Sequence, residues 1–170
     1  APDTLGFTAS DSAWIGNLSS SQGVYIEMRS DDDSPTPAFR KFEFSWQRNR
    51  YGELLPLLDR EILLALEKDS KTLYSIGLRQ ITQGKDIREF NPMKIKLDVH
   101  FKGERIVDYH ILPSLQWLFI RSSSGRLLAV TRDKRVNVIA EGLANVTDWG
   151  FAGNNRILYA ISGHRLRLFA

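Results

Sequence analysis

The chain has 170 residues, of which 42% are hydrophobic and 25% are charged, and it contains no cysteine. This composition is typical of a globular protein, and it excludes disulfides, thiolate metal sites and cysteine nucleophiles from these residues. The formal net charge of +3 is too small to predict a specific nucleic-acid partner, and every apolar run is much shorter than the roughly 20 residues that span a bilayer.

One pattern of strands and turns recurs four times along the chain. In each copy a leading segment ends at a small polar residue, and two apolar strands joined by a polar turn begin three residues later. The first of these two strands starts at Trp14, Ile62, Trp117 and Ile157. The small polar residues are turn formers, whose side chains bond to nearby backbone: Asp11, Asp59, Ser114 and Asn154. Self-similarity at intervals of roughly 40 to 55 residues predicts a repeat architecture.

The first two copies are expected to have four strands each, over 4–11, 14–18, 24–28 and 41–46, then over 52–59, 62–66, 72–76 and 93–101. The last strand of each copy alternates apolar and polar residues, which indicates one buried and one wet face. The two middle strands are apolar almost throughout, as expected for strands covered on both faces. The leucine-rich segment 53–68 could instead form a helix starting near Pro56, but its apolar positions are too continuous for an amphipathic stripe, and we expect strands there.

The third copy has expected strands over 107–114, 117–120, 127–130 and 136–138, and the fourth over 147–154, 157–161 and 165–169. Four strands in meander order within about 40 to 50 residues are typical of a propeller blade. The predicted fold is therefore all-β, a single β-propeller-like domain over 1–170 with about four blades of antiparallel strands, at 4–46, 52–101, 106–140 and 146–170. Because the fourth blade is a strand short, the domain is either a section of a larger propeller or a four-bladed ring of its own.

Residues 106–133, which read IVDYHILPSLQWLFIRSSSGRLLAVTRD, resemble a degenerate WD40-like blade. The turn at 122–125 falls where that family places its hairpin turn, although the Gly-His and Trp-Asp dipeptides of the family are absent. The resemblance covers the strand pattern of most of the chain. It implies a scaffold for binding, and it assigns a function to no particular residue.

Blade topology places the hairpin turns and the links between blades on one face, and this face is predicted to be basic. Arg48, Arg50 and Arg105 lie in the links, and Tyr51 adds a stacking group beside two arginines. The predicted partner-binding residues are Arg48, Arg50, Tyr51, Lys102, Arg105, Arg126 and His164. We expect them to contact a protein partner or an anionic ligand, and the alternative is ordinary solvated turn charge. The longer connection 80–92 is a further candidate, because loops carry function on a rigid scaffold.

The sequence predicts no catalytic residue, no cofactor and no metal site. It lacks a Walker phosphate loop, a dinucleotide glycine fingerprint and a nucleophile elbow. The acidic run Asp31–Asp33, expected on the opposite face, lacks the glycine and the distal glutamate of a calcium loop. Asp98 and His100, like Asp108 and His110, would share one side of a strand; we interpret them as surface or hydrogen-bonded pairs rather than as metal ligands or an acid and base.

Three functions follow from these observations. The first is a non-catalytic interaction module. The second is an extracytoplasmic sensing or regulatory domain of a bacterial membrane transport permease, of the phosphate type among others. Such a domain would lie in the periplasm and be tethered through segments outside this chain. The motivation is that the chain starts at Ala1 and has no cysteine. The third is a propeller-scaffold hydrolase or lyase, which requires carboxylates to converge from Asp11, Asp59, Asp108 and Asp148.

Overall fold

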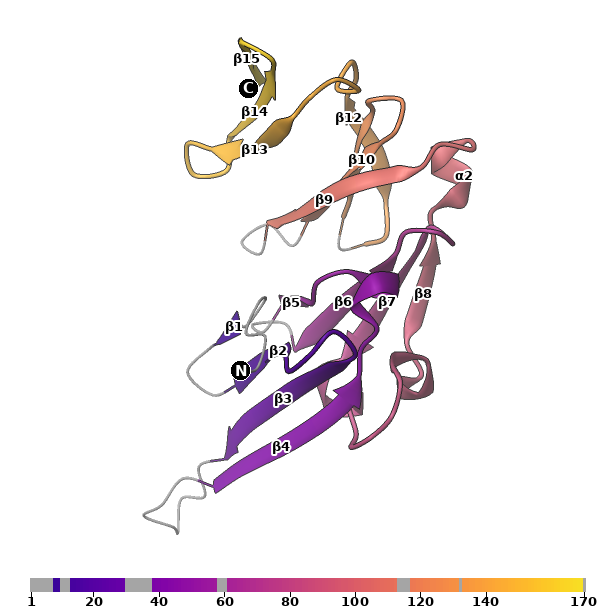
Figure 1. Ribbon diagram of the computed structural model, residues 1–170, viewed down its shortest axis with the longest axis vertical. Helices are drawn as coiled ribbons and strands as arrows, with labels where there is room; N and C mark the ends of the chain where they lie inside the picture. The colour runs from indigo at the N-terminus through magenta and orange to yellow at the C-terminus, as the bar shows by residue number, and fades with distance from the viewer. Residues whose placement is uncertain are drawn as a thin grey trace. The chain divides into compact units, whose positions relative to one another are not determined.

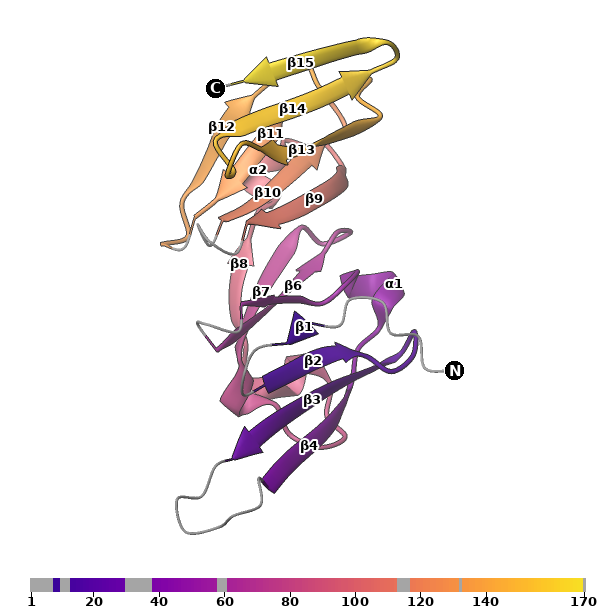
Figure 2. The ribbon, with the colours of Figure 1, turned by 90° about the vertical axis from the view of Figure 1, so that its left-hand side faces the viewer.

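A computed structural model describes residues 8–9, 13–29, 38–57, 61–112, 117–131 and 133–169, and it shows four antiparallel sheets (Figures 1 and 2). Within each sheet the strands are neighbours in chain order, which confirms the predicted meander. The chain divides into two compact units, Ala1–Leu97 (unit 1) and Asp98–Ala170 (unit 2), and each unit contains two of the sheets. The predicted all-β class with four antiparallel sheets of three or four strands is therefore confirmed, and the closure of these sheets into a propeller stays a prediction.

Unit 1 contains two four-stranded sheets. The first has β1 (Thr8–Ala9), β2 (Ala13–Asn17), β3 (Gln22–Arg29) and β4 (Ala38–Ser45), and the second has β5 (Leu55–Leu57), β6 (Ile62–Glu67), β7 (Thr72–Gly77) and β8 (Met93–Lys96). The short helix α1 (Arg48–Tyr51) links the two sheets, and the 3-10 turns η2 (Leu78–Gln80) and η3 (Ile87–Phe90) lie between β7 and β8. The leucine-rich segment is a pair of strands, as expected: Leu63 and Leu66 of β6, on opposite faces of the strand, are both fully buried.

Aromatic side chains fill the core between the sheets of unit 1. Phe44 and Trp46 meet edge to face at 6.3 Å, and Tyr51 lies 5.6 Å from Trp46, all three almost inaccessible to solvent. The indole nitrogen of Trp46 donates a hydrogen bond to the carbonyl of Gly52 at 2.9 Å, so the buried ring also satisfies its polar atom. This cluster holds the link after β4 against both sheets.

The predicted strand over 93–101 is wrong beyond residue 96. Leu97 donates its backbone N–H to the carbonyl of Lys71 at 2.7 Å, and Asp98–Phe101 form the one-turn helix α2. Apolar residues at positions 97 and 101 fit a strand of period two, but they are also four residues apart, the spacing of one helical turn. Periodicity could not separate these alternatives, and Asp98 and His100 consequently do not share one side of a strand.

Unit 2 contains a four-stranded sheet and a three-stranded sheet (Figure 2). Their strands are β9 (Ile106–Leu112), β10 (Trp117–Ser122), β11 (Leu127–Val130) and β12 (Val136–Ala140), then β13 (Asp148–Ala152), β14 (Ile157–Ser162) and β15 (Arg165–Phe169). Trp149 of β13 is buried in the core between the sheets, with Phe119 and Leu127. Asn154, one of the predicted turn formers, has a φ of 56° in the turn between β13 and β14. The other three, like the acidic run Asp31–Asp33, lie outside the described residues.

The sequence predicted that the second hairpin strand of the fourth copy is covered on both faces, and this prediction is wrong. Leu166 and Leu168 of β15 are 61% and 63% exposed. They project from the opposite side of the strand to Phe169, which packs against the core. β15 is the outermost strand of a three-stranded sheet, so its side chains have a neighbouring strand on one side only, β14.

A partly buried ion pair joins β9 and β10 of unit 2: the side chain of Arg121 is 8% exposed and that of Asp108 is 40% exposed. The guanidinium of Arg121 donates to both carboxylate oxygens of Asp108 at 2.9 and 2.7 Å, and to the carbonyl of Val146 at 2.6 Å. The indole of Trp149 donates to the same carboxylate at 3.0 Å. His110 lies edge to face against Trp149, with 4.4 Å between the ring centroids. Asp108 is thus held by hydrogen bonds, whereas His110 is an exposed residue whose ring packs against Trp149.

Candidate functional site

The hairpin turns and the links between sheets lie side by side within each unit. In unit 1 the N–H of Arg48 donates to the carbonyl of Ser20 at 2.9 Å. In unit 2 the N–H of Ser123 donates to the carbonyl of Arg105 at 2.8 Å. Each unit therefore brings its predicted basic residues to one end of its sheets. Their availability to a partner depends on the contacts that each charged group makes within the chain.

In unit 1 the predicted basic residues have partners within the chain. Arg50 pairs with Glu67 at 3.2 Å and lies over the ring of Tyr51, 5.3 Å from its centroid. Arg48 lies 3.8 Å from Glu53. Tyr51 has no exposed surface, so its ring contributes to the core and is not accessible for stacking. These contacts attach α1 to the second sheet.

In unit 2 one predicted residue is structural and three are at the surface. Arg126 pairs with Glu104 at 3.0 Å and donates to the carbonyl of His100 at 2.6 Å. Burial raises the pKa of Glu104, but hydrogen bonds from Ser122, Ser124 and Arg126 outweigh it, and the pKa lies below its ordinary value. The exposed residues are Lys102, Arg105 and His164.

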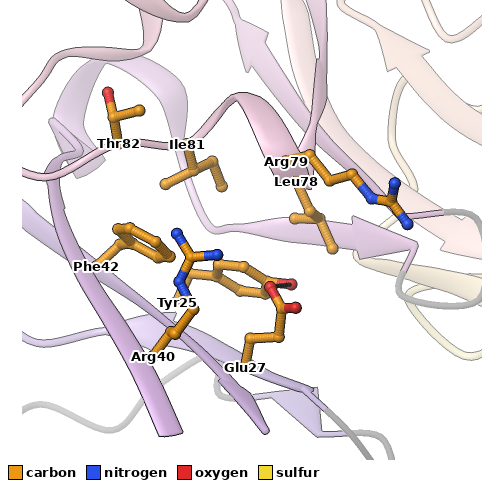
Figure 3. A pocket seen from close by; sticks show the side chains of 8 residues that line it. All are labelled: Tyr25, Glu27, Arg40, Phe42, Leu78, Arg79, Ile81 and Thr82. Carbon is orange, nitrogen blue, oxygen red and sulfur yellow. Dashed lines mark hydrogen bonds between the residues drawn. The ribbon is translucent and has the colours of Figure 1, made fainter. Parts of the chain in front are cut away.

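A pocket of about 380 Å³ lies in unit 1, between the first sheet and the segment 78–82 that follows β7 (Figure 3). Cross-strand register builds its floor, because Tyr25 of β3 is opposite Phe42 of β4, and Glu27 is opposite Arg40. All four side chains project from the same face of the sheet. The pocket is lined by Tyr25, Glu27, Arg40, Phe42, Leu78, Arg79, Ile81 and Thr82.

Two aromatic rings and a guanidinium are stacked in this pocket. The rings of Tyr25 and Phe42 are nearly parallel, with 13° between their planes and 6.3 Å between centroids. The guanidinium of Arg40 lies 4.9 Å from the centroid of Phe42, and Figure 3 shows it projecting from the sheet toward Ile81. Leu78 and Ile81 are buried and close the opposite wall with apolar surface.

The charged groups of the pocket differ in their pairing. Arg79 turns away from Tyr25 in Figure 3, and it pairs with Glu61 at 3.3 Å. Glu27 accepts a hydrogen bond from the hydroxyl of Tyr25 at 3.3 Å. Arg40 forms no ion pair with any residue in the described part of the chain, and its side chain is exposed. The pocket therefore offers a planar cation that has no ion-pair partner among the described residues, above an aromatic floor that also carries the Glu27 carboxylate.

Burial, and then the negative charge of Glu27 and its hydrogen bond, raise the pKa of Tyr25 to about 12. The phenol therefore keeps its proton well into alkaline solution, and it donates that proton in a hydrogen bond to Glu27. A group in this state positions its neighbour and cannot serve as a base.

Tyr25 should remain protonated in alkaline solution where an ordinary tyrosine has ionised. Because the folded-state pKa is raised, the stabilisation by the neutral phenol is complete below about pH 10 and is lost as the pH rises toward 12. Near-ultraviolet absorbance would be compared for the native protein and Tyr25→Phe at about pH 11, with circular dichroism to confirm that both are folded. We expect equal tyrosinate absorbance. A larger absorbance in the native protein by one tyrosinate would contradict the raised pKa.

Sequence reasoning missed this pocket, although part of the signal was present. The predicted outer strand began at residue 41 and so excluded Arg40, and Phe42 was assigned to the buried face. In each strand an aromatic and a charged residue stand two positions apart, which places them on one face. Ile81 and Thr82 come from the connection 80–92, for which a functional role was predicted. Which face of the sheet that connection would cover was not visible in the sequence.

The described residues contain no group of three or more histidine and acidic side chains placed to hold a metal ion. None of the helices in the described ranges is long and apolar enough to cross a membrane. No protein-family model matches the sequence. A comparison with curated proteins gives no significant match.

Proposed function

We propose that the chain is a non-catalytic binding module, and that the pocket of unit 1 takes a ligand in which an anionic group adjoins a flat apolar group. The observation that carries this proposal is the guanidinium of Arg40, which forms no ion pair with a described residue and lies over the stacked rings of Tyr25 and Phe42. The guanidinium fork matches the geometry of carboxylate and phosphate oxygens. The rings offer an apolar surface on which a flat or extended group is removed from water.

A binding role also fits the chemistry of the other lining groups. Tyr25 is held protonated, and its hydroxyl is directed to Glu27. No histidine lines the pocket, and Thr82 has no base beside it among the lining residues. A hydrolase or lyase would need free carboxylates, whereas Asp108 is held by Arg121 and Trp149. These contacts favour binding over catalysis.

We also propose that the four sheets are propeller blades of the degenerate WD40-like kind. The support is their meander order, their three or four strands each, and the hairpin turns that lie beside the links within each unit. In such a scaffold the sheets are rigid supports, and binding groups project from their faces and connections. The role as a sensing domain of a transport permease remains a prediction.

Replacing Arg40 by alanine should weaken the binding of a small aromatic anion. Phenyl phosphate and benzoate would be titrated into the isotopically labelled protein, with chemical shifts of Tyr25 and Phe42 as the readout. Loss of a charge-assisted hydrogen bond should reduce affinity about 10- to 100-fold. Arg40→Lys should fall in between, because it keeps the charge but loses the fork.

Lys41→Ala is the matched control, since Lys41 is the next cation on β4 and projects from the opposite face of the strand. It should bind both anions as the native protein does. Equal affinities for Arg40→Ala and Lys41→Ala, or no shift of pocket resonances with either anion, would refute the proposed site.

A further inference from the structure

One edge of the first sheet is only half covered. β4 is the outermost strand of that sheet, and the segment 83–86 runs along its C-terminal half. Gly84 donates its N–H to the carbonyl of Glu43 at 2.7 Å, and Ser45 donates to the carbonyl of Lys85 at 2.9 Å. Ser45 and Asp86 form a parallel bridge. The chain itself thus shows that this edge accepts an added strand.

The other half of the edge has backbone groups that no described residue pairs with. In an antiparallel pair, alternate residues direct their N–H and C=O groups toward the partner strand and away from it. Glu43 and Ser45 direct theirs away from β3, so Lys41 and Phe39 do the same. No described residue forms a backbone hydrogen bond with the outward groups of Phe39 or Lys41. Within the described part of the chain, two donors and two acceptors therefore lack a backbone partner and can pair with a further strand.

The pocket is directly beside this open edge. Arg40, between Phe39 and Lys41, projects into the pocket, while Phe39 projects from the other face and is 66% exposed. A strand added along β4 would place its side chains alternately next to Arg40 and next to Phe39. The ammonium of Lys41 is already 3.1 Å from Glu43, whereas Arg40 forms no ion pair with any residue that the structure describes.

We infer that the edge at Phe39–Lys41 binds an extended peptide as an additional strand, with an acidic side chain of the peptide in the pocket against Arg40 and an apolar side chain over Phe39. The inference rests on the proposed function, because it names the ligand of the same pocket. Backbone hydrogen bonds supply affinity in this mode of recognition, and the two alternating side-chain contacts supply specificity. The stem of a glutamate would lie along the ring of Phe42, which joins the anionic and apolar features of the pocket in one ligand.

The test uses the whole chain and fluorescent synthetic peptides of about six residues, in which acidic and apolar residues alternate. A second set has the same composition with the alternation scrambled. Anisotropy should show binding of the alternating peptides at least about tenfold tighter than of the scrambled ones. N-methylation of the peptide backbone on the side that faces β4 should abolish binding to the unaltered protein, because it removes the donors of the added ladder.

Lys41→Pro removes an outward N–H that is not part of the β3–β4 ladder, so the sheet keeps its own hydrogen bonds. Lys41→Val is the control, because it removes the charge and keeps the N–H. We expect Lys41→Pro to lose about tenfold or more in peptide affinity relative to Lys41→Val, while both bind phenyl phosphate as the native protein does.

The outcomes separate the two proposals. Strand addition would be overturned if no alternating peptide bound, or if neither N-methylation nor Lys41→Pro changed the peptide affinity. Binding of phenyl phosphate through Arg40 would still uphold the pocket in either case. In that case the lysine serves as a common device that keeps a sheet edge from pairing. Failure of phenyl phosphate, benzoate and every peptide to bind would overturn both.

Discussion

Replacing Asp108 by alanine is expected to destabilise unit 2 by about 3 kcal/mol, because it leaves a buried guanidinium without its counter-charge. The side chain of Arg121 is only 8% exposed. Its two shortest hydrogen bonds go to this carboxylate and to the carbonyl of Val146. The substitution also removes the acceptor of the Trp149 indole. Chemical denaturation followed by tryptophan fluorescence would measure the loss in the free energy of unfolding.

Asp133→Ala is the matched control for this effect. Asp133 also pairs with an arginine, at 3.5 Å from Arg135, but both side chains are more than two-thirds exposed. Solvent screens such a pair, so the change should be within about 0.5 kcal/mol of zero. The double variant Asp108→Ala with Arg121→Met should recover part of the stability, since no buried charge then remains unpaired. Equal losses for Asp108→Ala and Asp133→Ala would show that the Arg121 network does not stabilise the unit.

Replacing Gly125 by alanine should cost about 3 kcal/mol or more, because two independent requirements for glycine coincide there. Its φ of 89° lies in the left-handed half of backbone space. A Cβ at this position would also meet the backbone of Ala144 and lie 2.7 Å from the nitrogen of Leu143. Because Leu143 donates its N–H to the carbonyl of Gly125 at 2.8 Å, the two segments cannot separate without breaking that bond.

Gly163→Ala separates the backbone strain from the steric clash. Gly163 has a φ of 60° in the turn between β14 and β15, and no atom lies within 4 Å of the position that its Cβ would take. This substitution should cost about 1 kcal/mol from the left-handed conformation alone. Thermal denaturation of the two variants would give the comparison. Similar losses of stability in both variants would mean that the segment 143–144 can move away from a Cβ at position 125 at little cost.

The local pattern of the sequence was sufficient for the strands and their order. Apolar runs such as 62–66 and turn formers such as Asn154 specify a strand or a turn through the nearest few residues, and the structure contains these elements where they were expected. Consecutive strands joined by short turns pair with one another, and this made the meander of each sheet predictable. The segment 97–101 is the exception, because the spacing of its apolar residues fits both a strand and a helical turn, and residues Asp98–Phe101 form a helix.

Only the tertiary structure decided which side chains are available to a ligand. Arg50 and Arg126 are cations in surface turns by sequence, yet they are paired with Glu67 and Glu104, which stand 17 and 22 residues away.

The pocket depends on such non-local placement. The register of β3 and β4 sets Tyr25 opposite Phe42 and Glu27 opposite Arg40, and the segment 78–82 closes over them from another sheet. The sequence by itself determined the all-β class, the four-fold strand pattern and the order of the strands, because these follow from interactions between neighbours in the chain. Charge pairing, burial and the pocket depend on contacts between residues distant in sequence, so they were determined only when the sheets packed.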